Sequence, residues 1–228
     1  MTPPRPLGRS IADAFAAQAV SATFTLVTAV VTMRILGPHE YGVLAIVFGF
    51  ATVAALLCDL GLSMAAARFA AERFDSPSAV ARVARDALAV KVVLAVVVAT
   101  VIMALSDPIG HALGAEGGVW ALRLMAAAAG AQAIFASAIG TLNAVRRTRV
   151  SLVAVCIESV VESLGTGVAV LLAGTAAAAA AGRLTGYIAG AIVSVVLMAR
   201  ALGLRRPGPR VVSWGGRSAG CCCFRPPW

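Results

Sequence analysis

The chain has 228 residues, of which 60% are hydrophobic and 13% charged, and its mean hydropathy is +0.92. A water-soluble domain carries about 25% charged residues, so this composition excludes a soluble protein and indicates an integral membrane protein. The net charge of +9 does not favour nucleic-acid binding, because the arginines lie in short clusters between apolar stretches.

Six apolar segments are long enough to cross a bilayer as helices, each of which needs roughly 20 residues. Residues 1–14 are short and partly basic, and we expect them to form a cytoplasmic N-terminus before a first span that is retained rather than cleaved. The sequence therefore predicts an all-α integral membrane protein with a six-helix transmembrane bundle. The predicted spans are residues 15–36, 41–65, 87–105, 119–142, 151–172 and 175–202.

The connections between these segments contain helix breakers. In LGPHEYG, Pro38 cannot extend a helix and Gly37 supplies an open backbone, which predicts a tight turn at the outer face. Residues 106–118, SDPIGHALGAEGG, carry a proline and several glycines, and we expect an exposed loop there.

The basic residues alternate from one connection to the next. The connections 37–40, 106–118 and 173–174 contain no Lys or Arg. Because cytoplasmic loops carry the excess of Lys and Arg, the alternation predicts six crossings with both termini in the cytoplasm. The basic connections and ends contain Arg5, Arg9, Arg68, Arg73, Arg82, Arg85, Lys91, Arg146, Arg147, Arg149, Arg200, Arg205 and Arg206.

The sequence contains no recognisable enzymatic, cofactor or metal motif. His39 and His111 lie in predicted outer loops, and neither has a carboxylate or cysteine at ligand spacing. The five cysteines show no C-x-x-C spacing, and neither a G-x-S-x-G nor a P-loop pattern is present. We therefore expect a protein that is not an enzyme and that uses no cofactor or metal.

Residues 34–72 resemble a known family. The stretch RILGPHEYGVLAIVFGFATVAALLCDLGLSMAAARFAAE contains R-x-LGP-x-x-YG, D-x-GL and A-x-R-x-x-A-E. This stretch is similar to the N-terminal hairpin of the polysaccharide biosynthesis flippases, the O-antigen and exopolysaccharide translocases of the multidrug/oligosaccharidyl-lipid/polysaccharide exporter superfamily. The resemblance covers about forty residues closely and the rest by the pattern of spans.

The resemblance implies one lobe of a two-lobe transporter in the bacterial inner membrane. Such a protein would move an undecaprenyl-pyrophosphate-linked oligosaccharide to the outer leaflet for surface polysaccharide such as lipopolysaccharide. Six spans correspond to the N-terminal lobe, so a homodimer or a separate second lobe would complete the cavity. Two alternatives stay open: a truncated fragment without function, and a drug/cation antiporter of the same superfamily.

Three arginines lie in the outer half of the predicted bundle. Arg123 lies about 6 Å and Arg183 about 12 Å inside the outer ends of their spans, at 1.5 Å per residue, and Arg34 ends the first span. For a flippase we expect these residues to bind the pyrophosphate, since guanidinium pairs bidentately with phosphate oxygens. The alternative for Arg34 and Arg123 is snorkelling to the interface.

Three carboxylates also lie within predicted spans. Glu158 and Glu162 are four residues apart and share one helix face, and Glu162 lies near the depth of Arg183. Either Glu162 and Arg183 form an ion pair, or one carboxylate binds a proton or Na⁺ and couples a gradient to transport. Asp59, of the D-x-GL motif, is expected to cap a helix or to pair with a cytoplasmic arginine.

The last predicted span carries a small residue at every fourth position, including Gly182, Gly186 and Gly190. This ridge predicts close helix packing, either within the chain or between two copies in a homodimer. The tail, residues 203–228, turns abruptly rich in Arg, Pro, Gly and Cys. We expect the tail to be basic and disordered, with Cys221, Cys222 and Cys223 as lipidation candidates, or else the end of a frame-shifted gene.

Overall fold

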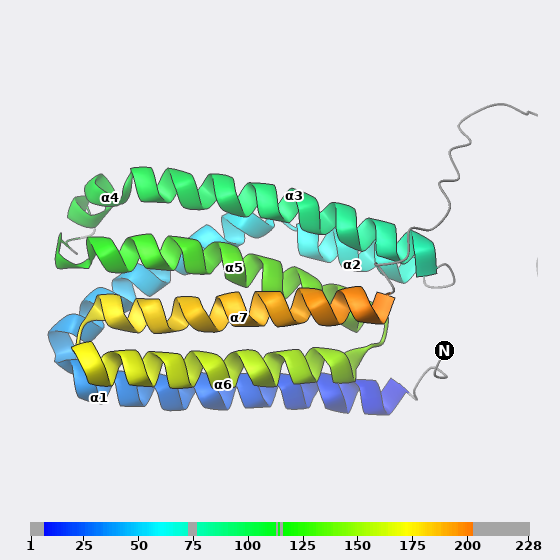
Figure 1. Ribbon diagram of the computed structural model, residues 1–228, viewed down its shortest axis with the longest axis horizontal. Helices are drawn as coiled ribbons and strands as arrows, with labels where there is room; N and C mark the ends of the chain where they lie inside the picture. Colours follow the sequence, from blue (N-terminus) through cyan, green and yellow to red (C-terminus); the bar gives the residue numbers. More distant parts are fainter. Residues whose placement is uncertain (1–6, 73–76, 113, 115, 203–228) are drawn as a thin grey trace, which may run out of the picture.

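The computed structural model describes residues 7–72, 77–112, 114 and 116–202, and the predicted tail at 203–228 lies outside them. All regular secondary structure in the described part of the chain is helical (Figure 1). The elements are α1 (Leu7–Asp59), α2 (Leu62–Glu72), α3 (Pro77–Ala104), α4 (Ser106–Ala112), the short 3-10 helix η1 (Glu116–Gly118), α5 (Val119–Ala144), α6 (Thr148–Ala173) and α7 (Ala176–Leu202).

The long helix α1 reverses direction at Gly37. This residue has φ 74° and ψ 175°, outside helical geometry, and Pro38 follows it directly. Figure 1 shows the first leg of α1 (7–36) running to the left-hand end of the bundle and the second leg (38–59) returning from it. The turn predicted from the sequence is therefore present, but helical structure continues up to it on both sides.

Five helices in the described residues are long and apolar enough to cross a membrane. The first covers 49 residues, Ile11–Asp59, which is enough for two crossings of roughly 20 residues each. With that helix counted as two legs, the bundle has the six passes that the sequence predicts.

The helices begin and end at other residues than the predicted spans. The first helix begins at Leu7, so most of the predicted cytoplasmic segment 1–14 is helical. The second span does not run to residue 65, because the chain breaks after Asp59 and α2 follows. The helix α3 begins at Pro77, ten residues before the predicted span. A helix can begin at this residue because proline is tolerated in the first helical turn. The predicted loop 106–118 contains α4 and η1.

Helix α7 lies at the centre of the packing. It packs against α5 on one side and α6 on the other, while α1 lies along α6 and α3 along α5 (Figure 1). The buried surfaces of α5 and α7 are rich in alanine, including Ala128, Ala129, Ala179 and Ala180. Because lipid is as apolar as these side chains, such small residues stabilise the bundle through close van der Waals contact.

The turn at Gly37 is tied to the start of α7. The carboxylate of Glu40 accepts a hydrogen bond of 2.8 Å from the backbone N–H of Ala176, in the first turn of α7. A carboxylate at this position satisfies an unpaired N–H group and interacts favourably with the helix dipole. On the other side of this connection, Gly174 ends α6 in the left-handed conformation, with φ 59°.

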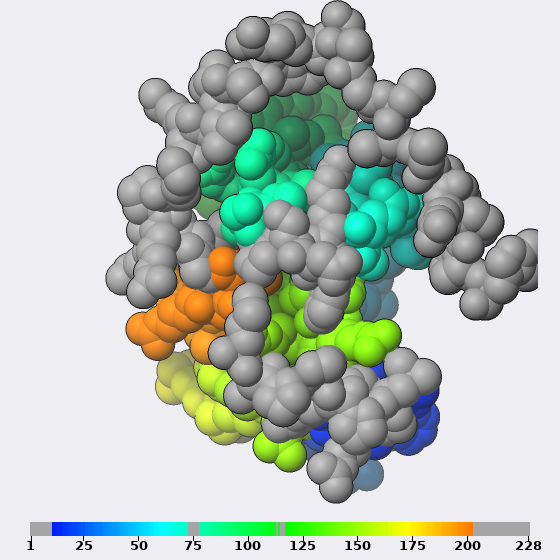
Figure 2. Space-filling model, turned by 90° about the vertical axis from the view of Figure 1, so that its right-hand side faces the viewer, coloured from blue at the N-terminus to red at the C-terminus, as the bar shows by residue number. Residues whose placement is uncertain are grey.

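The first and last described helices begin and end at the same end of the bundle (Figure 1). Figure 2 looks onto this end, where blue, cyan, green and orange parts of the chain all reach the surface. The segments α2, the start of α3 and the α5–α6 connection, whose sequences contain arginines, lie at this end (Figure 1). The charge asymmetry read from the sequence thus corresponds to one physical end of the molecule.

Candidate functional site

A group of charged side chains is buried between α6, α7 and the second leg of α1. Arg183 on α7 is 8% exposed and Glu162 on α6 is 9% exposed. The Nε atom of Arg183 lies 3.6 Å from Oε1 of Glu162. The guanidinium carbon lies 4.3 Å from the ring centroid of Phe48, which α1 contributes. A buried cation over an aromatic face gains a further favourable interaction.

The second carboxylate of this group is Glu158, one helical turn along α6. It is 5% exposed and accepts a hydrogen bond of 3.3 Å from the hydroxyl of Ser159. We call Glu158, Glu162 and Arg183 the buried charge cluster. With all three ionised, the cluster holds two negative charges and one positive charge. An imbalance of this kind is costly inside a membrane protein, and ionisable groups kept there usually have a function.

The glycine ridge of α7 allows α6 to come this close. A Cβ at Gly186 would lie 2.5 Å from the Cα of Glu162, and a Cβ at Gly190 would lie 2.5 Å from the Cγ of Glu158. At Gly182 the backbone of Thr166 occupies the corresponding position. The ridge is therefore covered by α6 within the chain.

Polar side chains continue from the buried charge cluster toward the first leg of α1. The hydroxyl of Thr28 donates a hydrogen bond of 2.8 Å to Ser163 of α6. The hydroxyl of Thr166 and the Nε of Arg183 are buried without a hydrogen-bond partner in the described part of the chain. The contact of 3.6 Å between this Nε and Glu162 is thus an ion pair without a hydrogen bond.

The other two arginines singled out in the sequence lie apart from this cluster. Arg123 donates to the hydroxyl of Ser106 at 2.7 Å and pairs with Asp107 at 3.1 Å, which ties α5 to α4. Its guanidinium also lies 5.1 Å from the ring of Trp120. Arg34 is exposed, and no ion pair involves it in the described residues. The three arginines are not brought together.

Asp59 has a partner that the sequence analysis did not identify. It pairs with Lys91 of α3 rather than with an arginine, and Lys91 is 0% exposed. Counting Lys91 among the basic residues of a connection was wrong, because α3 begins fourteen residues earlier, at Pro77. Its place within an apolar segment was the signal that could have revealed it, since an ionisable residue in a span needs a partner.

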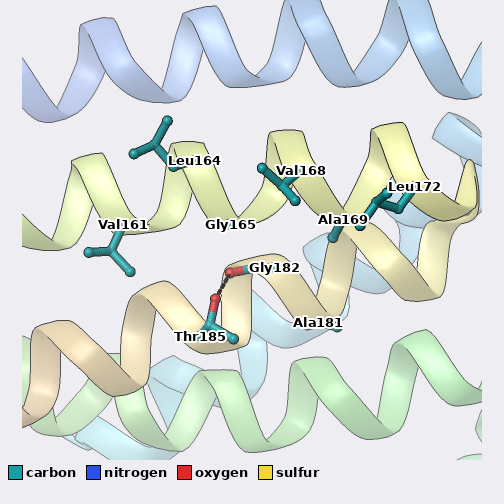
Figure 3. Close-up of a pocket in the computed structure, with 9 residues that line it drawn as sticks. All are labelled: Val161, Leu164, Gly165, Val168, Ala169, Leu172, Ala181, Gly182 and Thr185. Carbon is teal, nitrogen blue, oxygen red and sulfur yellow. Dashed lines mark hydrogen bonds between the residues drawn. The ribbon is translucent and has the colours of Figure 1, made fainter.

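A groove of about 550 Å³ lies between α6 and α7. Figure 3 shows its lining, which comes from Val161, Leu164 and Val168 of α6 and from Gly182 and Thr185 of α7, among others. The hydroxyl of Thr185 is the one polar side chain of this lining, and it donates to the carbonyl of Gly182 at 2.6 Å. The groove is an apolar surface that offers no group for binding a charged ligand.

The sequence pattern of the family described as "Polysaccharide biosynthesis protein" matches residues 7–213. Two solved structures have a similar fold. The first is described as the outward-facing conformation of a multidrug resistance MATE family transporter of the MOP superfamily, with a TM-score of 0.72 and 18% identity over 87% of this chain and 44% of that one.

The second structure is a crystal structure of MATE in complex with MaD5, with a TM-score of 0.70 and 16% identity over 88% of this chain and 46% of that one. The chain thus spans less than half the length of the solved transporters it matches, and its six-pass bundle corresponds to half of their fold. No curated protein matches the chain.

Proposed function

Because the chain belongs to the polysaccharide biosynthesis protein family, we propose that it moves an undecaprenyl-pyrophosphate-linked oligosaccharide across the bacterial inner membrane for surface polysaccharide synthesis. The six-pass bundle forms one lobe, and a second lobe completes the central cavity. Transport proceeds by alternating access, in which the two lobes rock against each other around a site near the middle of the membrane.

The observation that carries this proposal beyond family membership is the buried charge cluster. A bundle that served only as an anchor would have no use for three ionisable residues that are each at most 9% exposed. Charged groups at such depth usually belong to an ion or substrate pathway. Their position between α1, α6 and α7 also links three passes, so a change of charge there affects the packing of the whole lobe.

Within this proposal, Glu158 is the residue that takes up a proton or Na⁺. Arg183 balances one carboxylate, and Glu162 is the closer one, at 3.6 Å. Glu158 has only the Ser159 hydroxyl as a hydrogen-bond partner among the described residues. A bound cation at Glu158 would bring the cluster to neutrality, and its release would restore one negative charge. This cycle provides a way to couple an ion gradient to the motion of the lobe.

Arg34 is the candidate for contact with the diphosphate of the cargo. Arg183 faces Glu162 and Phe48, and Arg123 pairs with Asp107. Arg34 is exposed near the turn at Gly37, where its guanidinium can pair with phosphate oxygens. The basic end of the bundle, opposite this turn, faces the cytoplasm in the proposal.

The test is deletion of the gene, followed by analysis of surface polysaccharide and rescue with variants of the chain. Glu158→Gln and Arg34→Gln should each restore less than a tenth of the polysaccharide that the unchanged chain restores. Arg85→Gln is the matched control, because Arg85 is exposed and lies away from the cluster, and it should restore a normal amount. Normal polysaccharide after deletion would overturn the proposal.

A drug/cation antiporter is the second candidate, and the likeness of the fold to multidrug MATE transporters favours it. The two functions differ in their deletion phenotype. Loss of an antiporter raises sensitivity to cationic drugs and leaves surface polysaccharide unchanged, whereas loss of a flippase reduces polysaccharide. Both phenotypes can be measured on the same deletion strain.

A further inference from the structure

The helical pass that returns from the turn at Gly37 is broken at its far end. Leu60 and Gly61 have φ values of 39° and 77°, both in the left-handed region, and α2 begins at Leu62. Left-handed geometry is natural for glycine but disfavoured for leucine. The break therefore requires support from its surroundings.

Lys91 of α3 supplies contacts across this break. Its ammonium donates to Oδ1 of Asp59, the last residue of α1, and to the hydroxyl of Ser63, in the first turn of α2, at 2.5 Å. It also donates to the carbonyl of Ala133 on α5 at 3.1 Å. An ammonium group has three donors, so every donor of this fully buried lysine is used.

Asp59 and Ser63 are also joined directly. The hydroxyl of Ser63 donates to Oδ1 of Asp59 at 2.6 Å, and the backbone N–H of Ser63 lies 3.3 Å from the same oxygen. One carboxylate oxygen thus connects both sides of the break to α3. Through Lys91, the same contacts reach α5.

The apolar packing of α2 is slight by comparison. Among its eleven residues, only Ala66 and Ala70 are buried. Met64, on the same helix, is 78% exposed. An alanine offers one methyl group to its neighbours, so the position of α2 depends strongly on the polar contacts at its first turn.

We propose that Asp59, Ser63 and Lys91 form a latch that holds the end of α1 and the start of α2 against α3 and α5. When Lys91 leaves Asp59, both separate from these two helices, and α2 turns about Leu60 and Gly61. The latch controls access to the interior of the bundle from its basic end, where α2 lies (Figure 1). It accounts for the D-x-GL motif, in which the aspartate binds Lys91 and the glycine takes up the left-handed turn. The latch does not depend on which cargo the protein carries.

Cys58 provides a reporter of the latch. It is 1% exposed and packs against Ala95 of α3 and Ala133 of α5. Its thiol reacts with a maleimide only when the end of α1 separates from these two helices. Replacing Cys156 and the three cysteines at 221–223 by serine leaves Cys58 as the single thiol in the full chain.

In this background, Lys91→Met should raise the rate of Cys58 alkylation by N-ethylmaleimide at least tenfold in detergent-purified protein. Amide hydrogen exchange in residues 62–72 should rise at least tenfold as well, while exchange in α7 stays within twofold. The matched control is Arg85→Met on the same helix, whose side chain is exposed. It should leave both measurements within twofold of the parent.

The proposal is overturned if Lys91→Met alters Cys58 alkylation no more than Arg85→Met does, or if exchange rises equally in α2 and α7. If Lys91→Met does not fold, Ser63→Ala is used in its place, because it removes two hydrogen bonds of the latch and no charge. A rise in Cys58 alkylation of three- to tenfold is then expected, and an unchanged rate defeats the latch. Neither outcome depends on polysaccharide transport, so the latch and the flippase proposal fail or stand separately.

Discussion

Gly186 lies so close to Glu162 that a Cβ on the glycine would be 2.5 Å from the Cα of the glutamate. This approach brings the backbone of α7 onto the helix face that carries both buried carboxylates. It leaves no space for lipid or for a side chain between the two helices. The glycine ridge is therefore the structural condition for burying charge in this bundle, and not a separate packing feature.

The first prediction concerns this close approach. Gly186→Ala should destabilise the protein by about 1–3 kcal/mol, because overpacking forces helices apart. The atoms in the way belong to the backbone and Cβ of Glu162. Gly167→Ala on α6 is the control, since nothing lies within 4 Å of a Cβ there. It should be neutral or stabilising by up to ~1 kcal/mol, from helix propensity. Thermal unfolding in detergent measures both, and equal midpoints would contradict the packing argument.

The second prediction is an asymmetry within the buried charge cluster. Arg183→Met leaves two buried carboxylates without a counter-charge and should cost about 3–5 kcal/mol, as expected for a buried pair that loses one partner. Glu162→Gln should cost less, because Glu158 remains to balance the guanidinium. The double variant should recover part of the loss of Arg183→Met. The unfolding midpoints of the three variants test the order, and a Glu162→Gln variant less stable than Arg183→Met would refute it.

The third prediction separates Arg123 from Arg183. The side chains of Arg123 and Asp107 are 33% and 64% exposed, so their ion pair is largely solvated. A double-mutant cycle with Arg123→Gln and Asp107→Asn should therefore give a coupling of no more than about 1 kcal/mol. The same cycle on Arg183 and Glu162 should give a larger coupling. Similar values for the two pairs would mean that burial does not decide their strength.

The fourth prediction concerns the number of passes. Reporter fusions placed before residue 7 and after residue 202 should report the same side of the membrane, because α1 crosses twice. A reporter inserted in the connection at 113–115 should report the opposite side. If the reporters at the two ends lie on opposite sides, α1 crosses only once and the orientation inferred from the basic residues is wrong.

Much of this architecture follows from local features of the sequence. Hydropathy locates the passes, the Gly-Pro pair at residues 37 and 38 locates the reversal, and the alternation of arginines assigns one end of the bundle. The positions of α2, α4 and the start of α3 did not follow. These segments form helices, but they are less apolar than the membrane-spanning segments. A hydropathy pattern cannot distinguish such a polar helix from a loop.

The candidate site was only partly predictable for a related reason. The spacing of Glu158 and Glu162 places them on one face, and their depth matches that of Arg183. Lys91, however, was assigned to a connection, so its contact with Asp59 was missed. Two residues separated by 32 positions meet only because α3 packs beside the end of α1.

The sequence by itself determined that the chain crosses a membrane, where it turns and how many charges lie within its passes, because each of these depends on the free energy of moving short segments from water to lipid. The tertiary structure alone decided which charges meet. Arg183 faces Glu162 because the glycines of α7 let α6 approach closely, and Lys91 faces Asp59 because α3 packs beside the end of α1.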